Sequence, residues 1–391
     1  MNMNETFQRY SDHRHEAVRQ WKAETGRPVF GYFCCLSPEE ILFAADVLPV
    51  RITGTGEPLQ KADLHVPPNS CPFARSCLDA GMRGLYDYLD GVVVPNSCDI
   101  IFAMEYFWKT LVPRPTPPAL IAGVDIKPYV HYINYPEKIV GREVVPYYLE
   151  VLKKFKQDLE RTLGRTISDD DLARSISVYN QDKVQMKRLY ELRKSDPPAV
   201  SGYEAWQIAY AGLLMPKDQH AALLETWLDG IESEGRRAEE GVRIYLSGSA
   251  MDAVNAEIYR VIEDCGGQVV SDDLCVGTRS FWYPLNPDLP PMEAIARRSL
   301  GTACPRSTVT APIPENRWAH ILNTTRDYGV EGAIFYTLKC CDARLSEFPH
   351  LRDRFKAELD IPVLFLEGDY TSEGVSQMRG RVEAFIEMIE G

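Results

Sequence analysis

Apolar residues recur along the chain with two different periods. From residue 28 to about 135, short apolar runs that suit buried strands alternate with stretches whose apolar positions repeat every three or four residues, as in helices. Between 136 and 239 only the helical period remains, and after residue 240 the alternation returns. Strands that alternate with helices are typical of a mostly parallel sheet. The pattern predicts an N-terminal helix (1–27), an α/β domain (28–135), a helical segment (136–239) and a second α/β domain (240–391).

Local signals place the individual elements within these domains. The expected strands cover residues 28–33, 48–52, 91–95, 242–246, 268–270, 332–336 and 361–366. The expected helices include 71–88, 147–163, 169–194 and 375–389. Ser37, followed by Pro38 and two glutamates, predicts a helix N-terminus that Ser37 caps.

Composition and charge exclude several classes of protein. The chain has 391 residues, 45% of them apolar, and a formal net charge of -13, which allows two or three packed units with an acidic surface. Nucleic-acid binding needs clustered positive charge, so we expect no nucleic-acid partner. No apolar run approaches the ~20 residues of a membrane span, and the N-terminus lacks a signal-peptide pattern. We therefore expect a cytoplasmic protein without a membrane partner.

Cysteine is the residue type that points to chemistry. In a reducing compartment, ten cysteines are more often metal ligands or buried apolar residues than disulfides. Cys71, Cys98 and Cys341 stand where strands end or helices begin. Ligands gather outside the carboxyl ends of the strands in an open α/β sheet, and a helix N-terminus favours the thiolate that binds metal. These positions predict a metal site, although each cysteine alone can also be a buried apolar residue.

Other motifs mostly exclude functions. The chain has no G-x-x-x-x-G-K-[ST] sequence and no H-E-x-x-H sequence, which argues against P-loop ATP hydrolysis and a zincin-type hydrolase. The run 247–249 (SGS) follows an expected strand, where it either binds a phosphate or forms a plain strand-to-helix turn.

Seven segments resemble the 2-hydroxyacyl-CoA dehydratase D-component and benzoyl-CoA reductase family. They occur in the family's order from about residue 28 to 390: 31–41 (GYFCCLSPEEI), 44–51 (AADVLPVR), 71–76 (CPFARS), 90–99 (DGVVVPNSCD), 339–342 (KCCD), 361–369 (IPVLFLEGD) and 377–385 (QMRGRVEAF). The resemblance implies an α/β protein with two Rossmann-like parallel-sheet domains and a helical segment between and before them.

The resemblance also implies a cofactor. The family holds one low-potential [4Fe-4S] cluster per subunit on three cysteines, which by position are Cys71, Cys98 and Cys341. Three protein thiolates leave one iron open, as an inner-sphere role requires. A double cluster, or a different or fourth ligand, stays open as an alternative, since the chain also contains Cys77, Cys304 and Cys340.

Residues 271–282 (SDDLCVGTRSFW) resemble the benzoyl-CoA reductase branch, and the chain's length is similar to that of its smaller substrate-binding subunit. The resemblance implies reductive dearomatisation of an aromatic acyl-CoA. The implied partners are a paralogous cluster subunit and an ATP-hydrolysing activator that donates electrons. Ser37 is a candidate catalytic residue beside the open iron or the thioester. Arg279 and Arg306 are candidates for binding the CoA phosphates.

Three other functions fit the same residues. A 2-hydroxyacyl-CoA dehydratase subunit would bind the substrate's hydroxyl and carbonyl at the open iron, with no net consumption of electrons. A double-cluster electron-transfer or reductase protein would act without CoA and carry about eight irons per chain. A structural metal protein would unfold on chelation and give no redox signal.

Overall fold

Two four-stranded parallel sheets organise the protein. The computed structural model describes residues 3–113, 130–139, 141–249, 252–302 and 315–391. The first sheet has the order β2 (Leu48–Arg51), β1 (Val29–Tyr32), β3 (Gly91–Pro95), β4 (Val130–Ile133). The second has the order β6 (Gly267–Asp273), β5 (Val242–Gly248), β7 (Gly332–Leu338), β8 (Val363–Gly368). All the paired strands are parallel, which confirms the expected fold class.

Helices connect and cover these strands. In the first half they are α1 (Met3–Asp12), α2 (Arg14–Thr25), α3 (Glu39–Ala44), the short 3-10 helix η1 (Ala62–Leu64), α4 (Pro72–Met82) and α5 (Asp99–Leu111). The helical segment contains α6 (Val144–Leu163), α7 (Asp169–Glu191), α8 (Gly202–Ala211) and α9 (Lys217–Glu234). The remainder has α10 (Glu257–Asp264), α11 (Thr278–Phe281), α12 (Pro291–Gly301), α13 (Glu315–Asp327), α14 (Asp342–Arg354), the π-helical turn η3 (Phe355–Leu359), α15 (Ser372–Ser376) and α16 (Arg379–Glu390).

Buried apolar side chains lie on both faces of the first sheet. In β1, Phe30 and Tyr32 point to a core shared with α3, α6, α7 and α12, whereas Val29 belongs to the larger core that includes the second sheet. This division follows from the strand period of two residues. The larger core is continuous across both sheets, so the two α/β units are packed against each other rather than linked by a hinge alone.

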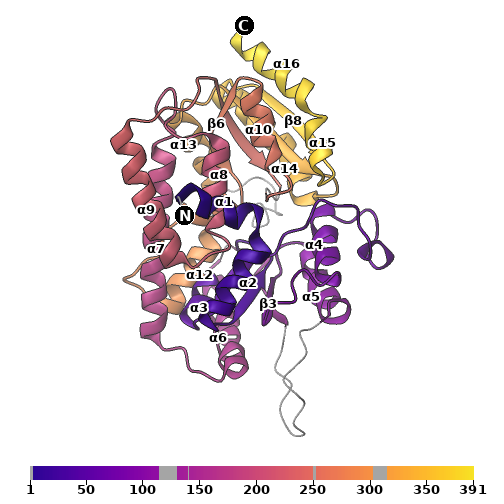
Figure 1. Ribbon diagram of the computed structural model, residues 1–391, viewed down its shortest axis with the longest axis vertical. Helices are drawn as coiled ribbons and strands as arrows, with labels where there is room; N and C mark the ends of the chain where they lie inside the picture. The colour runs from indigo at the N-terminus through magenta and orange to yellow at the C-terminus, as the bar shows by residue number, and fades with distance from the viewer. Residues whose placement is uncertain (1–2, 114–129, 140, 250–251, 303–314) are drawn as a thin grey trace.

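The helical segment connects the two units. Helix α7 begins with a capping box, in which the Ser168 hydroxyl accepts from Asp171 N–H and the Asp171 carboxylate accepts from Ser168 N–H. Helices α7 and α9 lie side by side (Figure 1), and α7 also contacts α3. Helix α12, from the second half of the chain, packs on α6 and α7.

The two sheets meet at the carboxyl ends of their strands. Tyr370, after β8, accepts from Gly54 N–H, which follows β2, and donates to Asp252 after β5. Phe73 of α4 packs edge-on against the Tyr370 ring. These contacts hold the loops of one unit against those of the other, and the space between them forms the candidate site.

Several elements differ from the expectation. The N-terminal helix is two helices, interrupted at His13, and the expected final helix is divided into α15 and α16. Strand β4 was not expected. The predicted cap at Ser37 is wrong, because α3 starts at Glu39 with Pro38 before it and no side-chain cap. The domain boundaries stay a prediction. None of the described helices combines the length and apolar character needed to cross a bilayer.

Candidate functional site

Three of the cysteines occupy equivalent local positions. Cys71, Cys98 and Cys341 are the residues immediately before α4, α5 and α14, respectively. Pro72 stands at the first position of α4, where it costs no hydrogen bond and fixes the backbone angle that a helix needs. Each thiol therefore lies at the N-terminus of a helix, where unpaired N–H groups and the helix dipole favour negative charge.

All three cysteines line one cavity of about 610 Å³ between the two sheets. Its walls come from the carboxyl ends of β1, β2 and β3 and from those of β5, β6 and β7, so segments far apart in sequence converge as predicted. A cavity of this volume suits a cofactor or part of a substrate. Four further cysteines also line it: Cys34, Cys35, Cys275 and Cys340.

Burial makes these thiols reluctant to ionise one by one. The pKa of Cys71 is raised, first by burial and then by the neighbouring Cys341, although the N–H group of Ala74 opposes the shift. Burial likewise raises the pKa of Cys98 to about 12, against the effect of Ile101 N–H. Crowded buried thiols ionise readily only when a cation compensates their charge. Bound metal would supply that cation.

The donor set fits an iron–sulfur cluster better than a single ion. Within the described part of the chain, no three His, Cys, Asp or Glu side chains stand close enough to bind one metal ion. A four-iron cluster is larger than an ion, so its thiolates surround a body rather than meet at a point. Three thiols from three helices around one cavity match this requirement, with Cys71, Cys98 and Cys341 as the residues that would hold the cluster.

The alternative cysteines are not equivalent. Cys340 also lines the cavity, but it has a φ of 57°, a left-handed conformation that turns the chain just before α14. Cys77 is fully buried within the core and is absent from the cavity lining. Cys304 and Arg306 lie outside the described residues.

One wall of the cavity carries positive charge. Arg279 and Arg344 line the cavity, and both pair with the buried Asp273, which Arg317 also contacts at 2.5 Å. Glu347 pairs with Arg317 and Arg344. Burial alone would raise the pKa of Asp273, but the three guanidinium groups, Arg317 first, hold it well below its usual range. Three guanidinium groups thus meet two carboxylates, which leaves net positive charge beside the cavity.

Comparison with known proteins identifies the family. Residues 34–389 match the family described as 2-hydroxyglutaryl-CoA dehydratase, D-component. The chain belongs to this family. This membership confirms the resemblance stated from the sequence, and the motifs that carried it contain Cys71, Cys98 and Cys341.

Relatives within the D-component family belong to both reductases and dehydratases. One benzoyl-CoA reductase polypeptide, from Thauera aromatica, is 27% identical over 384 residues, covering 97% of this chain and 96% of that protein. The (R)-phenyllactyl-CoA dehydratase beta subunit from Clostridium sporogenes is 23% identical, covering 94% and 93%. The (R)-2-hydroxyglutaryl-CoA dehydratase subunit beta from Acidaminococcus fermentans is 22% identical, covering 98% of each.

The remaining residues singled out from the sequence have different surroundings. Ser37 is buried, its hydroxyl has no hydrogen-bond partner in the part of the chain that the structure describes, and it is not among the cavity-lining residues. Arg279 reaches the cavity, but its guanidinium also donates to the main-chain oxygen of Asp273 at 2.8 Å. The functional roles assigned to Ser37 and Arg279 stay predictions.

Sequence reasoning missed two residues of the cavity wall. Arg51 is the last residue of β2, and Cys275 follows β6. Both line the cavity, and the Arg51 Nη2 atom lies 3.5 Å from the Cys275 sulfur. The rule that selected the metal-site cysteines, the carboxyl end of a parallel strand, applies equally to these two residues.

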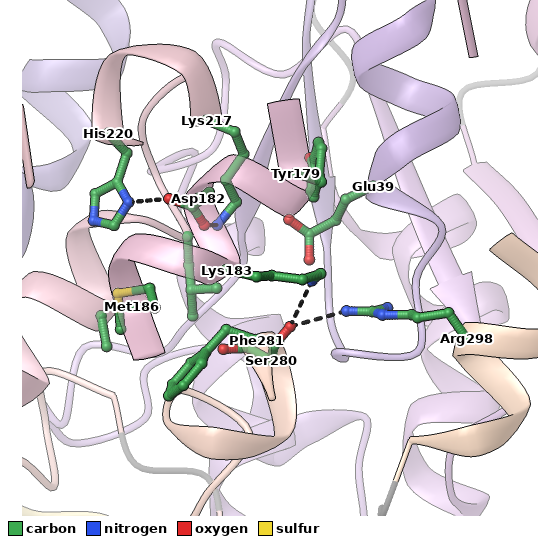
Figure 2. Close-up of a pocket in the computed structure, with 12 residues that line it drawn as sticks. Glu39, Tyr179, Asp182, Lys183, Met186, Lys217, His220, Ser280, Phe281 and Arg298 are labelled. Carbon is green, nitrogen blue, oxygen red and sulfur yellow. Dashed lines mark hydrogen bonds and ion pairs between the residues drawn. The ribbon is translucent and has the colours of Figure 1, made fainter. Parts of the chain in front are cut away.

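A second, smaller cavity lies within a buried group of charged residues (Figure 2). Its volume is about 20 Å³, enough for one water molecule. Lys183 and Arg298 both donate to the main-chain oxygen of Ser280, at 3.1 and 2.9 Å. Burial, followed by the charge of Arg298, lowers the pKa of Lys183 to about 7.

Further ion pairs surround this small cavity. Asp182 accepts from His220 and lies 3.4 Å from the Lys217 ammonium. The Glu39 carboxyl points into the same space in Figure 2, and burial raises its pKa. The group joins α3, α7, α9 and α12, so we interpret it as a structural junction between the helical segment and the two sheets.

Proposed function

We propose that this chain is an iron–sulfur subunit of an ATP-dependent benzoyl-CoA reductase. The observation that carries the proposal is the convergence of Cys71, Cys98 and Cys341, each at a helix N-terminus, around one cavity between the two sheets. The proposed cofactor is one [4Fe-4S] cluster, and its role is to pass single electrons at low potential to an aromatic acyl-CoA thioester.

The residues of the chain contribute binding, charge and exclusion of water. The three thiolates bind the iron atoms. Apolar residues of the cavity wall, among them Phe33, Phe73 and Leu338, keep water from the site and lower its dielectric constant. The positive group around Asp273 favours negative charge in the cavity, which suits both an anionic cluster and the oxygen of a reduced thioester.

The assignment to the reductase branch is supported by residues 271–282. This segment contributes Cys275 and Arg279 to the cavity wall, so a branch-specific sequence lies where substrate chemistry would occur. The reductase relative also has the highest identity of the three relatives described above. The second candidate function is a 2-hydroxyacyl-CoA dehydratase subunit, which the coverage of the two dehydratase relatives supports.

The proposed partners are a paralogous subunit with its own cluster and an ATP-hydrolysing activator. The named relatives are themselves subunits, which favours an assembly of more than one chain. Neither the activator nor the aromatic substrate follows from the geometry of this chain, so an assay must establish both.

Electron stoichiometry separates the two candidate reactions. The assembled enzyme, purified without oxygen together with its partner chains, is given a low-potential reductant, ATP and either benzoyl-CoA or a 2-hydroxyacyl-CoA. A reductase consumes electrons in proportion to the ring-reduced product. Water loss from the 2-hydroxyacyl-CoA with only catalytic amounts of reductant, and unchanged benzoyl-CoA, would instead identify a dehydratase.

A further inference from the structure

Arg51 is a buried cation at the wall of the cysteine cavity. It ends β2, where the strand's carboxyl end opens onto the cavity, and only 5% of the residue is exposed. Its main-chain N–H donates to the Leu213 oxygen at 3.0 Å, which fixes the backbone. The side chain therefore leaves a rigid position and reaches the cavity from the first sheet.

The guanidinium has unusual partners. Nη2 lies 3.5 Å from the Cys275 sulfur, and the guanidinium carbon lies 5.8 Å from the centre of the Tyr32 ring. Nη1 is buried and has no hydrogen-bond partner within the described ranges. No carboxylate of the described residues lies within salt-bridge distance of Arg51; its neighbours are a thiol and an aromatic ring.

Other buried arginines are compensated. Arg317 and Arg344 pair with Asp273 and Glu347. Arg243, on β5, donates to the main-chain oxygens of Tyr328, Ser195, Arg193 and Lys194. A buried charge that lacks such partners destabilises a fold strongly.

Sulfur surrounds Arg51 on the cavity side. Burial alone would lower the pKa of Arg51, but Cys275, then Cys34, raise it above the ordinary value. Cys34 also influences the pKa of Cys98, so the sulfur atoms extend from Arg51 towards the proposed metal ligands. An anion held in this cavity would lie next to the unpaired Nη1.

We propose that Arg51 is the buried counter-cation of the centre bound in the cavity, donating its Nη1–H groups to sulfur and so favouring the reduced state. This inference rests on the proposed function, because it takes the iron–sulfur cluster as the anion. A cluster becomes more negative by one charge on reduction, so a fixed positive charge beside it stabilises the reduced form more than the oxidised form. Cys275 and Tyr32 act as positioning residues, since they orient the guanidinium.

The first test compares reduction of the loaded chain in Arg51→Met and wild type. Reduction is followed by EPR against solution potential, without substrate or activator. At the potential where half of the wild-type clusters are reduced, the ratio of reduced to oxidised cluster in Arg51→Met is expected to fall about tenfold, equivalent to about 59 mV for one electron. Arg51→Lys, which restores a cation, is expected to recover most of the loss, and Arg243→Met is expected to leave the ratio unchanged.

The second test uses the iron-free chain. Without the cluster Arg51 lacks its counter-ion, so Arg51→Met is expected to unfold at the same temperature as wild type or at a higher one. Arg243→Met is expected to unfold at a lower temperature, because it leaves four main-chain oxygens without their donor. Unfolding of Arg51→Met at or below the temperature of Arg243→Met would overturn the proposal and make Arg51 a structural cation.

The outcomes separate this inference from the proposed function. A wild-type chain without iron contradicts the proposed function itself. An iron-loaded Arg51→Met with an unchanged ratio of reduced to oxidised cluster overturns only the assignment of Arg51. If that variant instead binds an acyl-CoA more weakly at an unchanged ratio, the anion that Arg51 compensates belongs to the substrate, and the assignment to the cluster is wrong.

Discussion

Cys98 and Cys341 hold the same position in two different sheets. Cys98 follows β3 and precedes α5, and Cys341 follows β7 and precedes α14. Strands β3 and β7 are themselves equivalent, since each lies between the first and the last strand of its unit. The two thiols face one cavity, and Cys341 contributes to the raised pKa of Cys98. Two similarly ordered sheets, packed at their carboxyl ends, thus build one site.

Gly248 fixes the close approach of β5 and β7 at the cavity. A Cβ atom at this position would lie 1.8 Å from the Tyr336 oxygen, and Ser249 N–H already donates to the same oxygen at 3.0 Å. We expect Gly248→Ala to lower the free energy of unfolding by about 3 kcal/mol, because neither backbone can move freely. Denaturant unfolding of the iron-free chain measures the effect.

Gly230→Ala is the matched control for this substitution. Gly230 lies in α9, and no atom stands within 4 Å of its added Cβ. Alanine there should raise the free energy of unfolding by about 0.5–1 kcal/mol, since it limits the unfolded chain and favours the helix. Equal effects of the two substitutions would show that the strand contact at Gly248 is not tight.

Asp273 holds the positive wall of the cavity together. Asp273→Asn leaves Arg279, Arg317 and Arg344 with the single carboxylate of Glu347, so we expect a loss of about 3–5 kcal/mol in the free energy of unfolding. Asp87→Asn is the control, because its pair with Arg19 is at the surface and should contribute less than about 1 kcal/mol. A similarly small loss for Asp273→Asn would contradict a role in stabilising the wall.

Lys183 predicts a particular dependence of stability on pH. Its pKa is about 7 in the folded chain and 10.5 in the unfolded one, so between these values the unfolded chain binds more protons. The contribution of Lys183 to the free energy of unfolding therefore rises as the pH increases from about 7 to 10.5. Thermal unfolding of the iron-free chain should show wild type gaining on Lys183→Met over that range.

Lys153→Met is the control for the pH experiment, since Lys153 is an exposed residue of α6 paired only with Glu150. Its difference from wild type should stay constant from about pH 7 to pH 9.5, because exposed charges keep ordinary pKa values. A difference between wild type and Lys183→Met that stays constant or shrinks with rising pH would contradict the burial of an uncharged Lys183.

Much of the site could be predicted because its geometry is local. Cys98 and Cys341 directly follow strongly apolar strands, and the carboxyl ends of parallel strands lie at one edge of a sheet. Strand β4 could not be predicted in the same way. It has four residues with a buried histidine, His131, among them, and its partner in the sheet is β3 rather than a local hairpin.

The sequence was least informative where tertiary contacts override local preference. Ser37 has the pattern of a helix cap, but its N–H donates to the Cys34 oxygen at 2.9 Å, and this turn starts α3 at Glu39. Arg51 reads as the end of an ordinary strand. Its unpaired charge becomes visible only when Cys275, more than two hundred residues later in the chain, is placed beside it.

The central claim is that Cys71, Cys98 and Cys341 hold an iron–sulfur cluster. Its most direct test is iron and acid-labile sulfide analysis with EPR, without oxygen, on wild type and the three Cys→Ala variants. Cys265→Ala is the control, because Cys265 lies at the end of α10, away from the cavity lining. We predict about four irons per wild-type chain, retained in Cys265→Ala and lost in each of the three variants. Iron-free wild type, or full iron retention in those three variants, would contradict the account.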